Sequence, residues 1–243
     1  MKNSNGTGLP FELDDVHLVI WDCDGVLVDS ERLAAKAIAI VIREFGGETS
    51  PDLVHQTLRG SSLDKAMQFI RTHAHVPPGT GLEEVYRNRS FEIFSNSLKP
   101  VPGVESILSG VLALQCVASN GPRPKILHNL RLTGLSGYFS PETIFSGHDL
   151  QKFKPDPELF LHAARSLSVD PQNCLVIEDS RHGAQAAALA RMKCLGYAAE
   201  TQPGELTEHR AYPFATMNQL YLIMKNAGLI AGSHERQNES GIG

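Results

Sequence analysis

Residues 18–30 read LVIWDCDGVLVDS. The apolar run at 18–21 predicts a short buried strand, and Gly25 predicts a tight turn shortly after it. Asp22 and Asp24 therefore lie two residues apart where the strand opens into the turn. Two carboxylates so close together repel each other, and the repulsion is relieved by a nearby cation or by a raised pKa. A bound divalent metal is the simplest remedy, and this layout is typical of a phosphoryl-transfer site.

More β-like runs follow along the chain, and helical patterns separate most of them. They lie at residues 116–118, 143–145, 174–177 and 194–197. Strands that alternate with helices form a parallel sheet with helices on both faces. The sequence therefore predicts an α/β fold with a Rossmann-like parallel sheet as its core.

The long stretch between the first two strands breaks this alternation. It contains helical patterns at residues 33–45, 62–73 and 82–94 and no convincing strand. We interpret residues 30–99 as a small all-helical cap domain inserted after the first strand. The two linkers that join it to the sheet would lie at one edge of the site, an arrangement that suits the hinge of a lid.

The remaining boundaries follow from this insertion. Residues 11–29 and 100–231 form the predicted α/β core domain. Residues 1–10 and 232–243 lack hydrophobic periodicity, so we interpret both segments as disordered tails.

The bulk composition excludes several classes of partner. The chain has 243 residues, of which 42% are hydrophobic and 20% charged, as in ordinary globular proteins. Its formal net charge of -5 provides no basic field, so binding to nucleic acid or to an anionic membrane is not expected. Small ligands are better candidate partners.

The cysteines and the N-terminus bear on the compartment. Cys23, Cys116, Cys174 and Cys194 show no C-x-x-C spacing and lie in or beside apolar runs, so we interpret them as reduced core thiols. The first ten residues contain no apolar signal region, and no apolar stretch approaches the roughly 18 residues that a membrane span needs. The sequence therefore predicts a cytoplasmic protein without a membrane segment.

Four polar clusters follow four predicted strands in order. The first is Asp22 with Asp24, and the others are Ser119-Asn120-Gly121, Lys154-Pro155-Asp156-Pro157 and Glu178-Asp179-Ser180. In an open parallel sheet, ligands bind beyond the carboxyl ends of the strands. We therefore expect the four clusters to meet at one edge of the sheet.

In this order and spacing, the four clusters resemble the motifs of the haloacid dehalogenase superfamily, specifically its members with a small helical cap after the first motif. The resemblance covers nearly the whole chain between the two tails. Three segments are similar to those of sugar-phosphate phosphatases related to β-phosphoglucomutase: CVASNGP (116–122), FSGHDLQKFKPDP (145–157) and IEDSRHG (177–183).

The resemblance implies a role for each acid of the first and fourth motifs. Asp22 would attack phosphorus and form an aspartyl-phosphate, which splits one hard displacement into two easier ones. Asp24 would protonate the leaving alkoxide and then deprotonate water. Asp22 and Asp179 would bind Mg²⁺ through their side chains, Asp24 through its backbone carbonyl, and Glu178 directly or through water. As an alternative, Asp24 would only form the turn before Gly25. Glu178 and Asp179 would only stabilise the N-terminus of the helix that follows them.

Three residues are candidate phosphate ligands. Lys154 supplies a point cation, Ser119 a hydroxyl donor and Asn120 a backbone amide. The alternative for Lys154 is a surface lysine, and S-N-G is also an ordinary turn sequence. In the cap, Arg59 lies at a glycine-centred polar turn and is our candidate for the end of the substrate that is not transferred. As an alternative, Arg59 would be a solvated surface charge without a role in binding, like most of the other cations of the cap.

Other polar residues of the motifs are predicted to begin helices. Asp29 and Ser30 would cap the first helix of the cap domain, and Ser180 would cap the helix that follows the fourth motif. Asp156 would be an N-cap with Pro157 at the first helical position, which would fix the direction of the neighbouring lysine.

One position departs from the family pattern. Relatives usually have Ala-Ala-Gly-Met after the helix of the fourth motif, whereas this chain has Arg191 in place of the glycine. That glycine would lie at a left-handed helix C-cap, where a side chain costs about 1 kcal/mol.

These observations favour a Mg²⁺-dependent phosphatase that hydrolyses a small sugar phosphate or sugar-acid phosphate, such as 6-phosphogluconate. The alternative is a phosphomutase like β-phosphoglucomutase, which would return the phosphoryl group to the substrate before water arrives. A non-catalytic binding module is disfavoured, because no motif is eroded. Removal of halide is disfavoured, because the dehalogenases lack the aspartate found here at Asp24. The small cap also implies a monomer.

Overall fold

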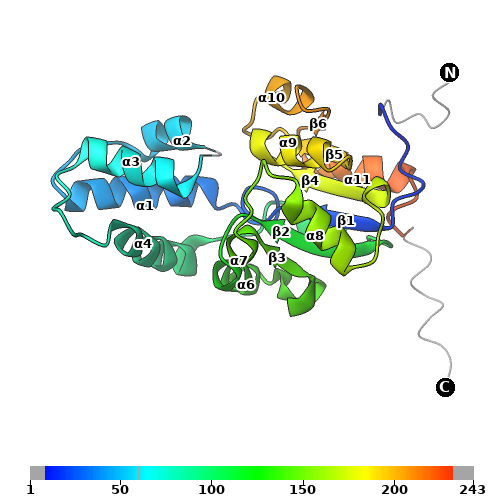
Figure 1. Cartoon of the computed structure of the whole chain (residues 1–243), viewed down its shortest axis with the longest axis horizontal. Coiled ribbons are helices and arrows are strands. Elements are labelled where there is room, and N and C mark those ends of the chain that lie inside the picture. The colour runs from blue at the N-terminus through cyan, green and yellow to red at the C-terminus, as the bar shows by residue number, and fades with distance from the viewer. Residues whose placement is uncertain (1–8, 60, 232–243) are drawn as a thin grey trace.

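The protein is built around a parallel sheet (Figure 1). A computed structural model describes residues 9–59 and 61–231. Within these ranges, six parallel strands lie in the order β3-β2-β1-β4-β5-β6, which confirms the predicted α/β class. They are β1 (Leu18–Trp21), β2 (Leu114–Ser119), β3 (Ile144–Ser146), β4 (Cys174–Glu178), β5 (Lys193–Tyr197) and β6 (Tyr212–Phe214).

The strand β1 pairs with β2 on one side and β4 on the other, and both of its faces are buried. Successive side chains of a strand point to opposite faces. Leu18 and Ile20 accordingly belong to one hydrophobic cluster, and Val19 and Trp21 to another. Trp21, the single tryptophan of the chain, is fully buried and donates its Nε1 hydrogen to Gln115 Oε1 over 3.1 Å.

Helices cover both faces of the sheet. One face carries α8 (Glu158–Ser166), α9 (Arg181–Leu189) and α10 (Pro203–Thr207). The other face carries α5 (Val104–Leu108), α6 (Arg123–Leu132) and α11 (Met217–Asn226). The short helix α7 (Gly147–Leu150) and the 3-10 segments Leu135–Tyr138, Pro141–Thr143 and Pro171–Asn173 lie in the connections.

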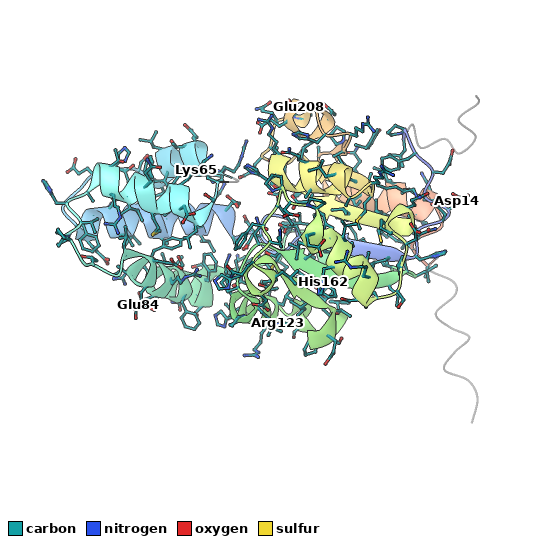
Figure 2. The ribbon with its side chains drawn as sticks, viewed as in Figure 1. Asp14, Lys65, Glu84, Arg123, His162 and Glu208 are labelled. Carbon is teal, nitrogen blue, oxygen red and sulfur yellow. The ribbon has the colours of Figure 1, made fainter. Side chains whose placement is uncertain are left out.

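The first four helices after β1 are called the cap below. They are α1 (Glu31–Glu44), α2 (Pro51–Leu58), α3 (Leu63–His73) and α4 (Leu82–Ser97), and they lie to one side of the sheet in Figure 1. They share a hydrophobic core of their own, to which Ile42, Val54 and Ile70 contribute. Lys65 and Glu84 are among the exposed side chains on the cap (Figure 2). The described residues of this stretch contain no strand, as the sequence predicts.

The helix α2 and the strand β6 are among the elements that the sequence patterns missed. The helix α2 begins at Pro51, and Ser50 caps it by accepting the main-chain N–H of Leu53 over 3.1 Å. A serine followed by a proline is a typical start of a helix, and the search for hydrophobic periodicity did not use it. The strand β6 has only three residues, with Pro213 in the middle. Proline cannot donate to a strand ladder, so it argues against a central strand; β6 lies at the edge of the sheet.

Several predicted boundaries differ from the observed ones by a few residues. Asp156 is not the N-cap of α8, because Pro157 holds that position and the helix begins at Glu158. Asp156 Oδ1 instead accepts the main-chain N–H of Glu158 over 2.9 Å. The predicted N-terminal tail included Leu9, which is buried in the hydrophobic core. Residues 1–8 and 232–243, the rest of the two predicted tails, lie outside the described residues.

The C-terminus of α9 has the left-handed conformation that the family pattern implies. Arg191 has a φ of 59°, and its main-chain N–H donates to Ala188 O over 3.1 Å. We expect Arg191→Gly to raise the free energy of unfolding by about 1 kcal/mol, because glycine adopts this conformation without steric cost. Urea denaturation measures the change, and Arg191→Ala is the control, since alanine keeps the β-carbon and the strain. An equal gain in both variants would contradict the explanation.

Two further sequence features bear on the environment of the chain. Of the helices in the described ranges, none combines the length and the apolarity needed to cross a bilayer. Cys23, Cys116, Cys174 and Cys194 are all buried and free, as predicted for core thiols.

Candidate active site

The four polar clusters of the sequence meet at the carboxyl edge of the sheet. Asp22 directly follows β1, Ser119 is the last residue of β2, and Glu178 is the last residue of β4. Because β2 and β4 flank β1, these three side chains leave the sheet side by side. Lys154 reaches the same place from the loop between α7 and α8.

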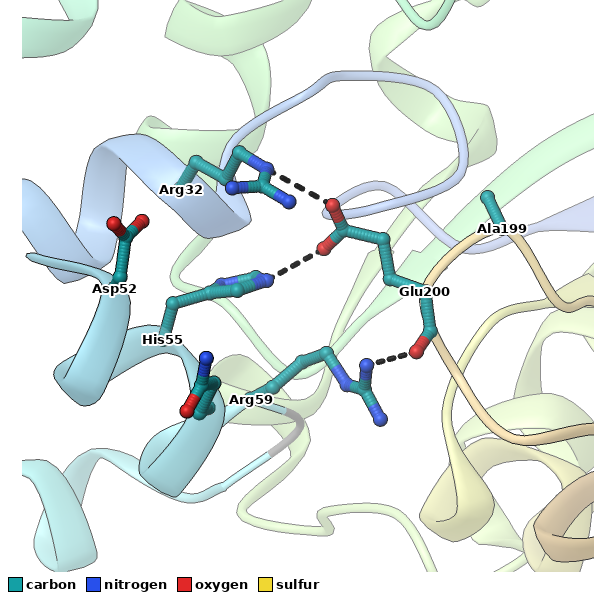
Figure 3. A pocket seen from close by; sticks show the side chains of 7 residues that line it. Arg32, Asp52, His55, Arg59, Ala199 and Glu200 are labelled. Atoms are coloured by element: carbon teal, nitrogen blue, oxygen red, sulfur yellow. Dashed lines mark hydrogen bonds and ion pairs between the residues drawn. The ribbon is translucent and has the colours of Figure 1, made fainter.

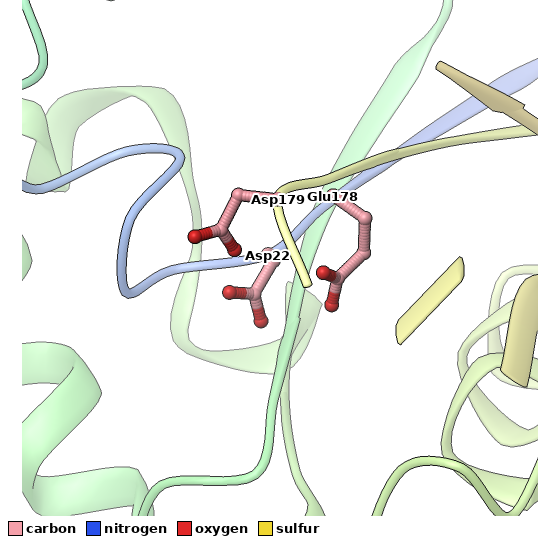
Figure 4. A group of neighbouring side chains, drawn as sticks. All are labelled: Asp22, Glu178 and Asp179. Carbon is pink, nitrogen blue, oxygen red and sulfur yellow. The ribbon is translucent and has the colours of Figure 1, made fainter. Parts of the chain in front are cut away.

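Three carboxylates form an acidic cluster at this edge (Figure 4). Asp22, Glu178 and Asp179 each place a carboxylate oxygen within 4.8 Å of the others. Asp22 is 8% exposed and Glu178 1% exposed, so two of the three acids are withdrawn from water. Hard oxygen donors gathered in this way are the ligands that Mg²⁺ prefers. The residues present therefore fit the metal that the motifs imply.

Burial and mutual repulsion make the ionised acids costly without a cation. Burial, followed by the charge of Glu178, raises the pKa of Asp22 to about 7 even though Lys154 opposes the shift. Burial and the charges of Glu178 and Asp22 raise the pKa of Asp179 well above its usual range. A divalent cation would offset both effects, because it favours the ionised form of every carboxylate around it.

Two glycines clear the space around the acids. Gly25 has a φ of +82°, and a β-carbon at this position would overlap the carboxylate of Asp179. A β-carbon at Gly183, in the first turn of α9, would overlap the carboxylate of Glu178. The turn after β1 and the start of α9 can therefore approach the acids closely only because both residues lack a side chain.

Lys154 is the cation of the cluster. Its Nζ lies 2.5 Å from Asp22 Oδ1 and 2.6 Å from Glu178 Oε1, and the residue is 7% exposed. Burial disfavours the charged amine, but the carboxylates of Asp22 and Glu178 outweigh it and raise the pKa of Lys154. Lys154 is therefore a charged, buried group beside Asp22, and the surface-lysine alternative is wrong.

The second motif supports the lysine loop. Asn120 Oδ1 accepts the main-chain N–H of Lys154 over 2.8 Å, so the Asn120 side chain holds the loop in place. Ser119 Oγ accepts the main-chain N–H of Gly121 over 3.2 Å and retains its own hydrogen for donation. Ser146 Oγ donates to Gly121 O over 2.7 Å, which joins the ends of β2 and β3. The Lys154-Pro155 peptide bond, which the sequence left open, is cis.

Ser180 does more than the predicted capping. Its Oγ accepts the main-chain N–H of Gly183 over 3.0 Å and thereby caps α9. It also donates from Oγ and from the main-chain nitrogen to Glu178 Oε2, over 2.9 and 2.8 Å. Both oxygens of Glu178 are thus engaged, Oε1 by Lys154 and Oε2 by Ser180, and its carboxylate is fixed in orientation.

Asp24 lies apart from the acidic cluster in its contacts. Ser30 Oγ donates to Asp24 Oδ1 over 2.7 Å, and Lys125 Nζ lies 2.7 Å from Asp24 Oδ2. Burial favours the neutral acid, but Lys125 and Ser30 together lower the pKa of Asp24. The prediction that the Ser30 side chain caps α1 is wrong: Ser30 holds the N-cap position without a side-chain cap, and its hydroxyl is turned to Asp24.

Lys125 is a site residue that the motifs did not reveal. It lies in the first turn of α6, a turn without an acidic residue. A cation near a helix N-terminus is opposed by the helix dipole, so its position there needs another reason. That unfavourable placement, a few residues after Ser119, is the signal that could have identified it.

Arg59 lies at the other side of the cap-sheet junction. It ends α2, and its Nη1 donates to the main-chain carbonyl of Glu200, in the loop after β5 (Figure 3). The structure therefore places Arg59 against the core, and its contact with a substrate stays a prediction. The other predicted site residues, from Asp22 to Asp179, are brought together at the sheet edge.

The raised pKa of Asp22 predicts how stability depends on pH without metal. Its carboxyl holds a proton up to about pH 7 in the folded chain, against a reference pKa of 3.8, so rising pH in this window favours unfolding. We expect the metal-free protein to lose about 2 to 4 kcal/mol between pH 4 and pH 7 relative to Asp22→Asn, which lacks this titration. Urea denaturation in a chelator measures the difference, and equal pH slopes in the two chains would contradict it.

The comparison with protein families covers most of the chain. The family model of haloacid dehalogenase-like hydrolases matches residues 19–197, which include all four motifs and the cap. The chain belongs to the haloacid dehalogenase-like hydrolases. This confirms the resemblance inferred from the four motifs.

Relatives of this hydrolase include phosphatases. The chain is 33% identical over 214 residues to 6-phosphogluconate phosphatase of Escherichia coli (strain K12). The matched residues make up 88% of this chain and 96% of that protein. It is 31% identical over 179 residues to a phosphorylated carbohydrates phosphatase of Thermotoga maritima, which covers 71% of this chain and 80% of the relative. With these relatives and the family match, the protein is a phosphoric monoester hydrolase.

Solved structures share the fold of this hydrolase. A haloacid dehalogenase-like protein of unknown function from Agrobacterium tumefaciens is similar with a TM-score of 0.76 and 28% identity, over 88% of this chain and 99% of that chain. A β-phosphoglucomutase from Clostridium difficile is similar with a TM-score of 0.69 and 25% identity, over 88% of this chain and 97% of that chain.

Proposed function

We propose that this hydrolase is a Mg²⁺-dependent phosphatase that acts on a small sugar phosphate or sugar-acid phosphate through an aspartyl-phosphate at Asp22. One observation carries the proposal. The Asp22 carboxylate stands at the end of the central strand, 2.5 Å from the ammonium of Lys154 and within 4.8 Å of carboxylate oxygens of Glu178 and Asp179, with Asp24 two residues further on. The phosphatases of sugar-type substrates among its relatives support the same substrate class.

In the proposed first half-reaction, a carboxylate oxygen of Asp22 attacks phosphorus while the bond from phosphorus to the ester oxygen breaks. Lys154 and the hydroxyl of Ser119 bind the oxygens of the phosphoryl group. When bound, Mg²⁺ supplies positive charge that lowers the repulsion between the phosphate and Asp22. Asp22 and Asp179 would hold it through their side chains, and Asp24 through its backbone carbonyl. Glu178 would act through water, since both of its oxygens are engaged.

Asp24 moves the proton in both half-reactions of the proposed mechanism. As the acid it gives its proton to the leaving alkoxide, and as the base it takes a proton from the water that attacks the aspartyl-phosphate. This second attack releases inorganic phosphate and regenerates the Asp22 carboxylate. The contacts to Ser30 and Lys125 stabilise the ionised form of Asp24, which is the form that the second half-reaction needs.

Lys125 is expected to tune Asp24 as a base. In Lys125→Met the pKa of Asp24 should rise, because the cation that lowers it is absent. We expect kcat to fall about tenfold, with its acid limb moved to higher pH, because hydrolysis of the aspartyl-phosphate becomes limiting. Rapid-quench kinetics should show a burst of the released alcohol, and Lys125→Arg should restore the rate. An unchanged pH profile would mean that the ion pair is only structural.

The phosphate-release assay tests the main proposal. The purified protein is incubated with Mg²⁺ or with a chelator and with a panel that includes 6-phosphogluconate, glucose 6-phosphate and β-glucose 1-phosphate. Release that requires Mg²⁺ supports the phosphatase and ranks its substrates. The absence of release from any sugar phosphate would overturn it.

A phosphomutase is the second candidate, because the β-phosphoglucomutase from Clostridium difficile shares the fold over 88% of this chain. The same site would then return the phosphoryl group to the sugar instead of to water. Conversion of β-glucose 1-phosphate to glucose 6-phosphate without free phosphate would establish the mutase and exclude the phosphatase.

The expectations on compartment and assembly are proposals too. We propose a cytoplasmic monomer, supported by the four free and buried cysteines and by the small size of the cap. Light scattering on the purified chain measures its mass, and a dimer would contradict the monomer. We propose no nucleic-acid or membrane partner, in line with the net charge of -5.

A further inference from the structure

A polar pocket lies between the cap and the sheet, outside the acidic cluster. It has a volume of about 400 Å³ and is lined by α1 and α2 of the cap and by the loop after β5. Figure 3 shows three cap side chains, Arg32, His55 and Arg59, converging on Glu200 of that loop. Asp52 also lines the pocket.

The pocket already holds a carboxylate, and that carboxylate belongs to the chain itself. Arg32 Nε donates to Glu200 Oε1 over 3.0 Å, and His55 Nε2 lies 2.7 Å from Glu200 Oε2 (Figure 3). Arg59 donates to the main-chain carbonyl of the same residue. Each oxygen of one carboxylate thus has its own donor, which is how a protein recognises a carboxylate group.

The burial of these groups is unequal. The side chain of His55 is 10% exposed, whereas that of Glu200 is 36% exposed and that of Arg32 61% exposed. The ring that binds the carboxylate is therefore fixed in the cap, while Glu200 lies on an open loop between β5 and α10. The exposed ion pair between Arg32 and Glu200 contributes little to stability, so a carboxylate from solution can replace Glu200 at low cost.

The pocket lies next to the candidate active site. Arg32 is in the first turn of α1, two residues after Ser30, whose hydroxyl donates to Asp24. The strand β5 pairs with β4 so that Gly196 lies opposite Glu178, and β5 ends at Tyr197, so the loop that carries Glu200 leaves the same edge of the sheet as the acidic cluster. A ligand that occupies both places would need an anionic group at each end.

We propose that Arg32 and His55 form a carboxylate subsite, in which the acid group of a phosphorylated sugar acid replaces the Glu200 carboxylate while the phosphate lies at Asp22. The proposal rests on the proposed function, and it selects sugar-acid phosphates over neutral sugar phosphates. A neutral sugar offers no group for this subsite, and Glu200 stays bound to Arg32 and His55. Glu200 acts as an internal competitor of the substrate carboxylate.

Ligand binding to a chain that cannot turn over tests the subsite directly. Titration calorimetry with Mg²⁺ compares 6-phosphogluconate with glucose 6-phosphate on the full-length Asp22→Asn chain, and on this chain with Arg32→Gln, His55→Gln or Glu200→Gln added. We expect Arg32→Gln and His55→Gln to raise the Kd of 6-phosphogluconate about tenfold, with the Kd of glucose 6-phosphate unchanged. Glu200→Gln should lower the Kd of 6-phosphogluconate about threefold, because the competitor loses its charge.

Arg87→Gln is the matched control, because Arg87 pairs with Glu83 within α4 and should leave both ligands unaffected. Equal effects of the pocket variants on both ligands would mean that the contacts only fasten the cap, and would overturn the subsite. A wild-type pocket with no preference for 6-phosphogluconate would overturn it as well. Phosphate release by the unsubstituted chain is measured separately, so an Arg32-dependent preference without any release would support the subsite and refute the phosphatase.

Discussion

Asp22→Asn is expected to lower phosphate release by about 10⁴-fold or more, because the amide cannot form the covalent intermediate and the remaining groups of the site act only around that step. The chain should still fold, since the amide has nearly the same shape as the carboxylate and removes one charge from a crowded cluster. Initial rates on a sugar phosphate with Mg²⁺ measure the loss.

The intermediate gives a second measurement for this variant. A chain stopped in acid during turnover should carry phosphate that hydroxylamine removes, as expected for an acyl phosphate, and Asp22→Asn should carry none. Asp29→Asn is the control, because Asp29 is an exposed acid of the same loop, and its rate should stay within about threefold. Full activity in Asp22→Asn would mean that another group is the nucleophile.

Lys154→Met is expected to have the second-largest effect, on both rate and stability. The substitution removes the ammonium that lies 2.5 Å from Asp22 and 2.6 Å from Glu178, and it leaves buried acids without their cation. We expect a loss of about 3 to 5 kcal/mol in the metal-free free energy of unfolding at pH 7. The rate with Mg²⁺ should fall about 10³-fold, because no other predicted phosphate ligand carries a positive charge.

Two comparisons separate charge from packing in this variant. Lowering the pH to 5 should recover part of the lost stability, because the acids around the missing lysine then take up protons. Lys152→Met is the matched control: its side chain is 52% exposed and pairs with Asp156 on the surface, so its loss should stay below about 0.5 kcal/mol. Equal losses in both variants would contradict the assigned role of Lys154.

The parts of the site that could be predicted are those that local sequence determines. Residues 18–21 are apolar throughout because β1 is buried on both faces, and the predicted strand has the bounds of β1. The acids Asp22, Glu178 and Asp179 lie at the carboxyl ends of β1 and β4, which are neighbours in the sheet, so their convergence follows from the topology of an α/β fold.

The parts that were missed depend on contacts between distant segments. Lys125 is 101 residues from Asp24, and Arg32 is 168 residues from Glu200, so no spacing in the sequence links either pair. The hydroxyl of Ser30 can bond either to the backbone of α1 or to Asp24. The three-dimensional fold of the loop brings it to Asp24, and the sequence alone does not show this. The strand β6 is stabilised by its place beside β5, since its own sequence, Tyr-Pro-Phe, has little strand character.

The position of Trp21 gives the protein an optical signal of its own. The chain has a single tryptophan, and it lies in the central strand, directly before Asp22 and in a different hydrophobic cluster from the core of the cap. Its emission therefore reports the melting of the sheet, whereas circular dichroism also reports the helices of the cap. If the cap unfolds first, the helical signal will fall while the emission keeps its native wavelength, and the cap and the sheet can be followed separately in one unlabelled sample.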